Sequence, residues 1–184
     1  MNDLLISENI DKEPYIKDIT NDKVINLTGE SGSGKSYFSK KYIKDDNYIV
    51  IDTDIVFSDR PSDNKESVEL RNQFKEISKD YLVTNFDEFY LKVLDYFKNS
   101  NKIIVIDSAQ YRNIKDYSIL KGKVIVMRTS AKTCYERVLN RWENIMKDYT
   151  DEEYNEYAKR KKAIFEWYKH INKFILEIEK LNKK

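Results

Sequence analysis

Residues 29–36 read GESGSGKS and fit the pattern G-x-x-x-x-G-K-[ST] of a phosphate-binding loop. Glycine has no Cβ, so the backbone can fold into a tight nest whose N–H groups turn toward an anion. The lysine of such a loop reaches the β- and γ-phosphates of a nucleotide, and the hydroxyl after it binds Mg²⁺. The pattern therefore predicts a nucleotide site built from Gly29, Glu30, Ser31, Gly32, Ser33, Gly34, Lys35 and Ser36.

The segments on either side of the loop support this interpretation. Residues 24–28 (VINLT) form a short, mostly apolar run, and residues 37–43 continue the loop as a helix. A strand, a glycine-rich loop and a helix in this order are the context that the motif requires. The alternative is a glycine-rich surface turn.

Three further apolar runs predict buried strands. They lie at residues 48–51, 103–106 and 124–127, and apolar residues at helical spacing fill 66–81 and 86–97 between them. Strands that are apolar on both faces and alternate with helices indicate a parallel sheet covered on both sides. We expect an α/β fold, namely a P-loop NTPase three-layer sandwich with a mainly parallel sheet of four to five strands and a long C-terminal helix.

The chain shows no linker or repeat, which predicts a single domain over residues 1–184. Residues 1–22 have scattered apolar positions without a clean period, so we expect an N-terminal arm packed on the domain. Residues 150–184 form the C-terminal helix, with an apolar stripe from about Glu152 to Leu181. Four strands are visible, and this helix occupies the place of a fifth.

The composition bounds the class of protein. A formal net charge of +1 offers no global attraction to nucleic acid, which makes a nucleic-acid partner unlikely, and no apolar run is long enough to span a membrane. The N-terminus does not read as a signal peptide, and the single cysteine, Cys134, excludes an internal disulfide. Together these features predict a cytoplasmic location.

Asp107 ends the apolar run 103–106 downstream of the loop, which is the context of a Walker B carboxylate that holds Mg²⁺. The alternative is an aspartate that caps a turn. Many NTP hydrolases place a glutamate after this aspartate to polarise water, whereas this chain has Ser108. The serine favours transfer of phosphate to an acceptor over hydrolysis.

Asp52 and Asp54 follow the run 48–51 and stand two positions apart, so their side chains would leave one side of a strand that continued through them. In an open α/β sheet the ligand crevice lies beyond the carboxyl ends of the strands. We assign Asp54 as the base that accepts the proton of an acceptor hydroxyl, with Asp52 nearer the metal. An ordinary polar turn is the alternative.

Arg137 and Arg141 are four residues apart and share one face of an expected helix. Ser130 is a good N-cap for this helix, whose apolar face carries Cys134, Val138, Trp142 and Ile145. Positive charge on a movable segment stabilises many phosphoryl-transfer sites, and a solvated charged face is the alternative.

With these residues in place, the chain resembles the P-loop kinases of the nucleotide and small-molecule kinase superfamily, such as adenylate, shikimate and gluconate kinases. The resemblance runs from about Lys23 to Trp142 and rests on GESGSGKS, the strand ends IDTD and IIVID, and the segment ERVLNR. The stretch IDTDIVFSDRP also looks loosely like the zeta-toxin and antibiotic phosphotransferase branch. The D-G-F-P-R signature of nucleoside monophosphate kinases is absent, and DSAQ stands there at 107–110.

The resemblance implies ATP and Mg²⁺ as cofactors. It also implies that Arg137 begins a lid and lies against adenine, while Arg141 reaches the phosphates. Our leading hypothesis is a kinase that transfers the γ-phosphate of ATP to a small hydroxyl-bearing acceptor, with Lys35, Asp54, Arg137 and Arg141 as catalytic residues and Ser36, Asp107 and Asp52 at the metal. The alternative is a P-loop NTPase or a nucleotide-binding regulatory module that couples ATP to a partner.

Overall fold

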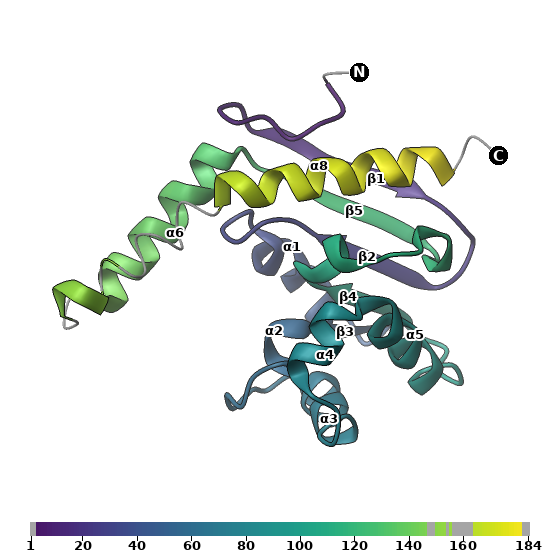
Figure 1. Ribbon diagram of the computed structural model, residues 1–184. Coiled ribbons are helices and arrows are strands. Elements are labelled where there is room, and N and C mark those ends of the chain that lie inside the picture. Colours follow the sequence, from purple (N-terminus) through teal and green to yellow (C-terminus); the bar gives the residue numbers. More distant parts are fainter. Residues whose placement is uncertain (1–2, 147–149, 154, 156–163, 182–184) are drawn as a thin grey trace.

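A five-stranded sheet forms the centre of the protein (Figure 1). The computed structural model describes residues 3–146, 150–153, 155 and 164–181. The strands are β1 (Lys12–Asp18), β2 (Val24–Thr28), β3 (Tyr48–Asp52), β4 (Ile103–Asp107) and β5 (Lys123–Arg128). The helices are α1 (Lys35–Ile43), α2 (Thr53–Val56), α3 (Lys65–Gln73), α4 (Lys79–Thr84), α5 (Phe86–Tyr96), α6 (Ala131–Met146) and α8 (Ile164–Leu181), with 3₁₀ turns η1 (Gln110–Asn113) and η2 (Tyr117–Ile119).

The strand order is β1-β5-β2-β4-β3, and β2, β3, β4 and β5 are parallel. The expected mainly parallel α/β sheet is therefore confirmed. The fifth strand comes from the N-terminal arm, because β1 pairs antiparallel with β5 in a register that sets Tyr15 opposite Val126. Tyr15 is buried on one face of β1 and Ile16 is 55% exposed on the other.

Helices cover both faces of the sheet, which completes the three layers. On one face, Ile25, Leu27, Val50, Val105 and Ile125 pack against Phe38 and Tyr42 of α1. On the opposite face, residues such as Ile51, Ile106 and Val126 join side chains of α5, η1 and α8 in the larger core. Figure 1 shows α8 running across the sheet in front of β1 and β5.

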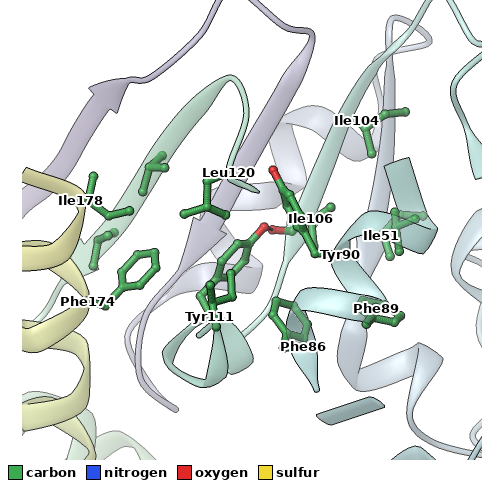
Figure 2. Close-up of a cluster of buried hydrophobic side chains, with 14 of the residues drawn as sticks. Ile51, Phe86, Phe89, Tyr90, Ile104, Ile106, Tyr111, Leu120, Phe174 and Ile178 are labelled. Carbon is green, nitrogen blue, oxygen red and sulfur yellow. Dashed lines mark hydrogen bonds between the residues drawn. The ribbon is translucent and has the colours of Figure 1, made fainter. Parts of the chain in front are cut away.

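Tyr111 lies at the centre of the larger core (Figure 2). Its ring packs edge-on against Phe86 of α5 at 5.2 Å and contacts Phe174 of α8 at 5.9 Å between ring centroids. Its hydroxyl donates to Asn26 Oδ1 at 3.0 Å, and Asn26 in turn donates to the carbonyls of Lys121 and Lys123. The one buried amide of β2 is thus fully bonded, and the strand that carries the phosphate loop is tied to its neighbour.

One local expectation was wrong. The helix expected over 66–81 is two helices, α3 and α4, because Ser78 offers a new N-cap and accepts from Tyr81 N at 3.4 Å. Asn85 is the residue before α5, and its side chain makes no cap hydrogen bond but donates to Tyr81 O at 2.9 Å.

The C-terminal apolar stripe is helical in α8, where Ile171, Phe174, Ile175 and Ile178 are buried. Residues 156–163 of the expected longer helix lie outside the described residues. Across the part of the chain that is described, we find no helix with the length and apolar character needed to cross a membrane.

Candidate functional site

The phosphate loop connects buried β2 to α1 over the carboxyl end of the sheet. Gly32 and Gly34 have φ angles of +80° and +94°, which residues other than glycine rarely adopt. At Gly32 an added Cβ would also stand 2.7 Å from the carbonyl oxygen of Cys134 in α6. The two glycines thus serve different ends, since Gly34 turns the chain into α1 and Gly32 also lets a second helix approach.

Lys35 folds back onto its own loop. Its Nζ donates to the carbonyl oxygens of Gly29 at 2.9 Å and Glu30 at 3.2 Å. Ser36, the next residue, is exposed at the start of α1. The ammonium group of Lys35 is therefore bound by neutral carbonyl groups. A negatively charged phosphate chain can replace these groups as its hydrogen-bond acceptor.

A cavity of about 230 Å³ opens beside this loop. It is lined by Ser31, Gly32, Gly34, Lys35, Ser36, Tyr37, Asp54, Asp107, Arg137 and Arg141. Residues expected at the site from four separate segments thus meet around one space. Gly29, Glu30, Ser33 and Asp52 lie outside this lining.

The two aspartates after β3 are placed differently, because the strand does not continue through them. It ends at Asp52, and α2 begins at Thr53. Asp52 Oδ1 accepts from Asp54 N at 2.9 Å and caps α2, so a short helix follows the strand here in place of an ordinary polar turn. Asp54, on the first turn of the helix, is exposed and lines the cavity. Asp54 therefore lines the cavity, whereas Asp52 caps α2 and lies outside the lining.

Asp107 ends β4 directly opposite Asp52 in the parallel register. Burial raises the pKa of Asp107 to about 7, and the nearby Asp52 also raises it, whereas the charge of Lys35 lowers it. Burial likewise raises the pKa of Asp52, and Asp54 adds to the effect. The carboxylates are therefore close enough to raise one another's pKa, and a cation placed among them would favour their charged forms.

Ser108 follows Asp107 and is engaged in the structure. Its Oγ accepts from Thr53 Oγ1 at 2.8 Å and from the backbone N of Gln110 at 2.9 Å. Ser108 thus connects the ends of β3 and β4.

Within the described residues, no three His, Cys, Asp or Glu side chains are grouped so that they could hold a metal by themselves. The lining nevertheless includes Ser36 with its hydroxyl and Asp107 with its carboxylate, and a second carboxylate, that of Asp52, belongs to the residue opposite Asp107 in the strand register. Oxygen donors of this number fit Mg²⁺, which keeps several waters and binds through one or two carboxylates together with substrate phosphates.

Helix α6 brings the two arginines to the loop. Ser130 Oγ accepts from Thr133 N at 3.1 Å, as expected for its N-cap, and Cys134 and Val138 are buried. Arg137 Nη1 donates to Gly32 O at 3.0 Å, and Arg141 lines the same cavity. The side chains of Trp142 and Ile145, expected on the buried face, lie outside the described residues.

Two features of the site were not predicted. Glu30 is only 3% exposed, and neither of its carboxylate oxygens has a hydrogen-bond partner among the described residues. Burial raises its pKa to about 7, against the opposing charges of Arg112 and Lys35. Tyr37 is 82% exposed at the cavity edge, and an aromatic residue directly after the loop serine was the signal for it.

Comparison with known proteins shows the family to which the chain belongs. No curated protein matches the sequence. A family model described as AAA domain matches residues 25–163, a range that includes the phosphate loop, Asp54, Asp107, Arg137 and Arg141. This match covers more than half of the chain. The chain therefore belongs to the AAA domain family, whose P-loop NTPase-related members include kinases such as shikimate and gluconate kinases.

Proposed function

We propose that this protein is an ATP- and Mg²⁺-dependent kinase that transfers the γ-phosphate to a hydroxyl group of a small-molecule acceptor. One observation carries the proposal: the Asp54 carboxylate lines the cavity that Lys35 and Ser36 also line. Within the part of the chain that the structure describes, this carboxylate accepts no hydrogen bond and forms no ion pair. It is available to accept a proton.

The reaction follows from this arrangement. The acceptor oxygen attacks the γ-phosphorus, a new O–P bond forms, and the bond from the γ-phosphorus to the β,γ-bridging oxygen breaks. Asp54 takes the hydroxyl proton, and ADP leaves with the electron pair of the broken bond. The acceptor must stand on the Asp54 side of the phosphates.

The other residues of the cavity stabilise charge. Lys35 exchanges its two carbonyl partners for the β- and γ-phosphate oxygens, while Arg137 and Arg141 approach from α6. Ser36 and Asp107, together with Asp52 opposite Asp107 in the strand register, would hold Mg²⁺, which would neutralise charge on the phosphate oxygens. Because Asp107 must be ionised for this, its raised pKa predicts that Mg²⁺ binding strengthens as the pH rises through about 7.

The test compares the native protein with Asp54→Asn. Each is given ATP, Mg²⁺ and a panel of nucleosides, sugars, aminoglycosides and nucleic-acid ends. We expect the loss of a general base to lower phosphate transfer roughly 10²- to 10⁴-fold without weakening ATP binding. Asp59→Asn is the matched control, because Asp59 is exposed, pairs with Lys79 at 2.9 Å and lies outside the site cavity.

Equal transfer rates for the native protein and Asp54→Asn would refute the assignment of the base. ATP hydrolysis that rises with a protein partner, and needs no acceptor, would instead support the NTPase alternative. Lys35→Ala should abolish ATP binding under either function, so it tests the loop alone.

A further inference from the structure

The first turn of α6 is held by a segment from the other end of the chain. We call residues 3–11 the N-terminal segment. Its carbonyls at Ser7 and Glu8 accept from the backbone N atoms of Ala131 at 3.1 Å and Lys132 at 2.9 Å. Backbone N–H groups in the first turn of a helix have no partner inside the helix, so this segment satisfies groups that would otherwise need water or a cap.

Asp11 adds a side-chain contact to the same turn. Its Oδ1 accepts from Ser130 N at 2.8 Å, and its Oδ2 accepts from Thr133 Oγ1 at 3.3 Å. One carboxylate therefore bonds both the N-cap residue of α6 and a residue one turn before Arg137.

The N-terminal segment is itself firmly attached. Arg128 donates to the carbonyls of Asp3 at 2.8 Å and Leu4 at 3.2 Å. Asn172 of α8 accepts from Ile6 N at 2.7 Å and donates to Ile6 O at 3.2 Å. These contacts to β5 and α8 give Asp11 a fixed support.

The turn held by Asp11 leads directly to the phosphate loop. Thr133 and Arg137 are four residues apart and thus share one face of α6, and Arg137 Nη1 donates to Gly32 O at 3.0 Å. Hydrogen bonds from Ser130 lower the pKa of Asp11, and the charge of Arg137 contributes to the same shift. The carboxylate and the guanidinium are therefore coupled electrostatically as well as through the helix.

We propose that Asp11 is a positioning residue for nucleotide binding, which holds the start of α6 so that Arg137 is presented to the phosphates. The inference rests on the proposed function, in which Arg137 contacts the nucleotide. Asp11 itself acts only through the helix that carries Arg137.

A double-mutant cycle on ATP affinity tests this inference. Asp11→Ala should weaken ATP binding roughly two- to tenfold, the equivalent of losing a helix cap. In the Arg137→Ala background the same change should weaken binding less than twofold, because the residue through which Asp11 acts is gone. Dissociation constants are measured with a fluorescent ATP analogue.

Two further variants separate positioning from general stability. Asp11→Asn keeps an oxygen that accepts from Ser130 N, so it should restore most of the affinity. Asp87→Ala is the matched control, because that carboxylate also accepts two backbone hydrogen bonds from a distant segment, from Lys115 N at 2.8 Å and Asp116 N at 2.9 Å. It should leave ATP affinity unchanged.

An equal loss of affinity in both backgrounds, or no loss with Asp11→Ala, would overturn the inference. These are binding measurements, so their outcome does not depend on whether phosphate is transferred. Failure of the kinase proposal would appear in the Asp54→Asn comparison instead.

Discussion

The two edges of the sheet hold their parts of the site in different ways. At the β3 edge, the outward backbone groups are bonded by α3: Ser67 Oγ accepts from Asp52 N at 2.9 Å, and Asn64 Nδ2 donates to Val50 O at 2.9 Å. Ser67 is fully buried. The opposite edge of the sheet is β1, which lies beside β5. Here the contacts that hold α6 come from the N-terminal segment before β1, and they include the exposed Asp11.

This difference separates two tasks. At the β3 edge the backbone of Asp52 is bonded to the buried Ser67, so the position of this residue is part of the stability of the fold. The arginines on α6 depend on hydrogen bonds at the surface, which can adjust at low cost when a nucleotide enters. Loss of a buried hydrogen bond at the first edge should therefore lower stability, and loss of a surface hydrogen bond at the second should mainly alter nucleotide affinity.

The largest expected effect is at the point where α6 touches the phosphate loop. Gly32→Ala places a Cβ 2.7 Å from Cys134 O at a φ of +80°. Left-handed backbone and overpacking together should lower the free energy of unfolding by about 3 kcal/mol or more. Urea denaturation measures this loss, and hydrogen exchange shows whether α6 is displaced.

Gly34→Ala is its matched control. Gly34 has a φ of +94°, but the nearest atoms to an added Cβ are 3.8 Å away. This variant should lose only the backbone cost of about 1–2 kcal/mol. Equal losses for the two variants would mean that α6 moves away from the added Cβ at little cost in stability. The difference in rigidity between the two edges would then be larger than we describe.

Glu30 is a buried carboxyl group of the phosphate loop, and its burial should make the stability of the protein depend on pH. Burial raises its pKa from an ordinary 4.5 to about 7, so the folded state holds a proton that the unfolded state has lost between these values. The stabilising contribution is complete below pH 4.5 and disappears as the pH rises through 7. Glu30→Gln should remove up to about 3 kcal/mol of this pH dependence from the nucleotide-free protein.

The measurement is the free energy of unfolding from pH 5 to pH 8 without nucleotide. Asp107 contributes a dependence of the same sign, because its pKa is also raised to about 7, so part of the slope remains in the variant. Glu76→Gln makes the same chemical change on the exposed surface and is the control. A slope in Glu30→Gln identical to that of the native protein contradicts the prediction.

The smallest expected effect is at the β3 edge itself. Ser67→Ala leaves the N–H of Asp52 without its buried acceptor, which should cost about 1–2 kcal/mol in chemical denaturation. Ser100→Ala removes a hydroxyl that accepts from Lys102 N at 3.1 Å in an exposed turn and should have little effect. If both serine variants are equally stable, the β3 edge is no more tightly held than the surface.

Much of the site could be predicted from local pattern. The phosphate loop, the strand that ends at Asp107 and the cap at Ser130 depend on residues that are close in sequence, and each is found where the pattern put it. Glycine spacing, apolar runs and capping residues report directly on backbone conformation, so these features need no knowledge of the rest of the fold.

The rest depended on contacts between distant residues. β1 was hidden because its partner lies far along the chain, and Pro14 within it favours an edge or a break. The turn of helix after Asp52 also escaped prediction, since an aspartate two residues before another is equally compatible with a strand and with an N-cap. Glu30 is also close enough to Cys134 of α6 for its charge to raise the pKa of that thiol, and this proximity of residues distant in sequence could not be predicted from local pattern.

The antiparallel pairing of β1 has a consequence for how the protein is made. Lys12 pairs with Arg128, so β1 leaves the ribosome long before its partner strand has been synthesised. At a translation rate of about 5–20 residues per second, this wait lasts roughly 6 to 25 s. Throughout that interval the nascent chain carries an unpaired strand with Tyr15 uncovered, and an unpaired strand of this kind makes a partly synthesised chain prone to aggregation.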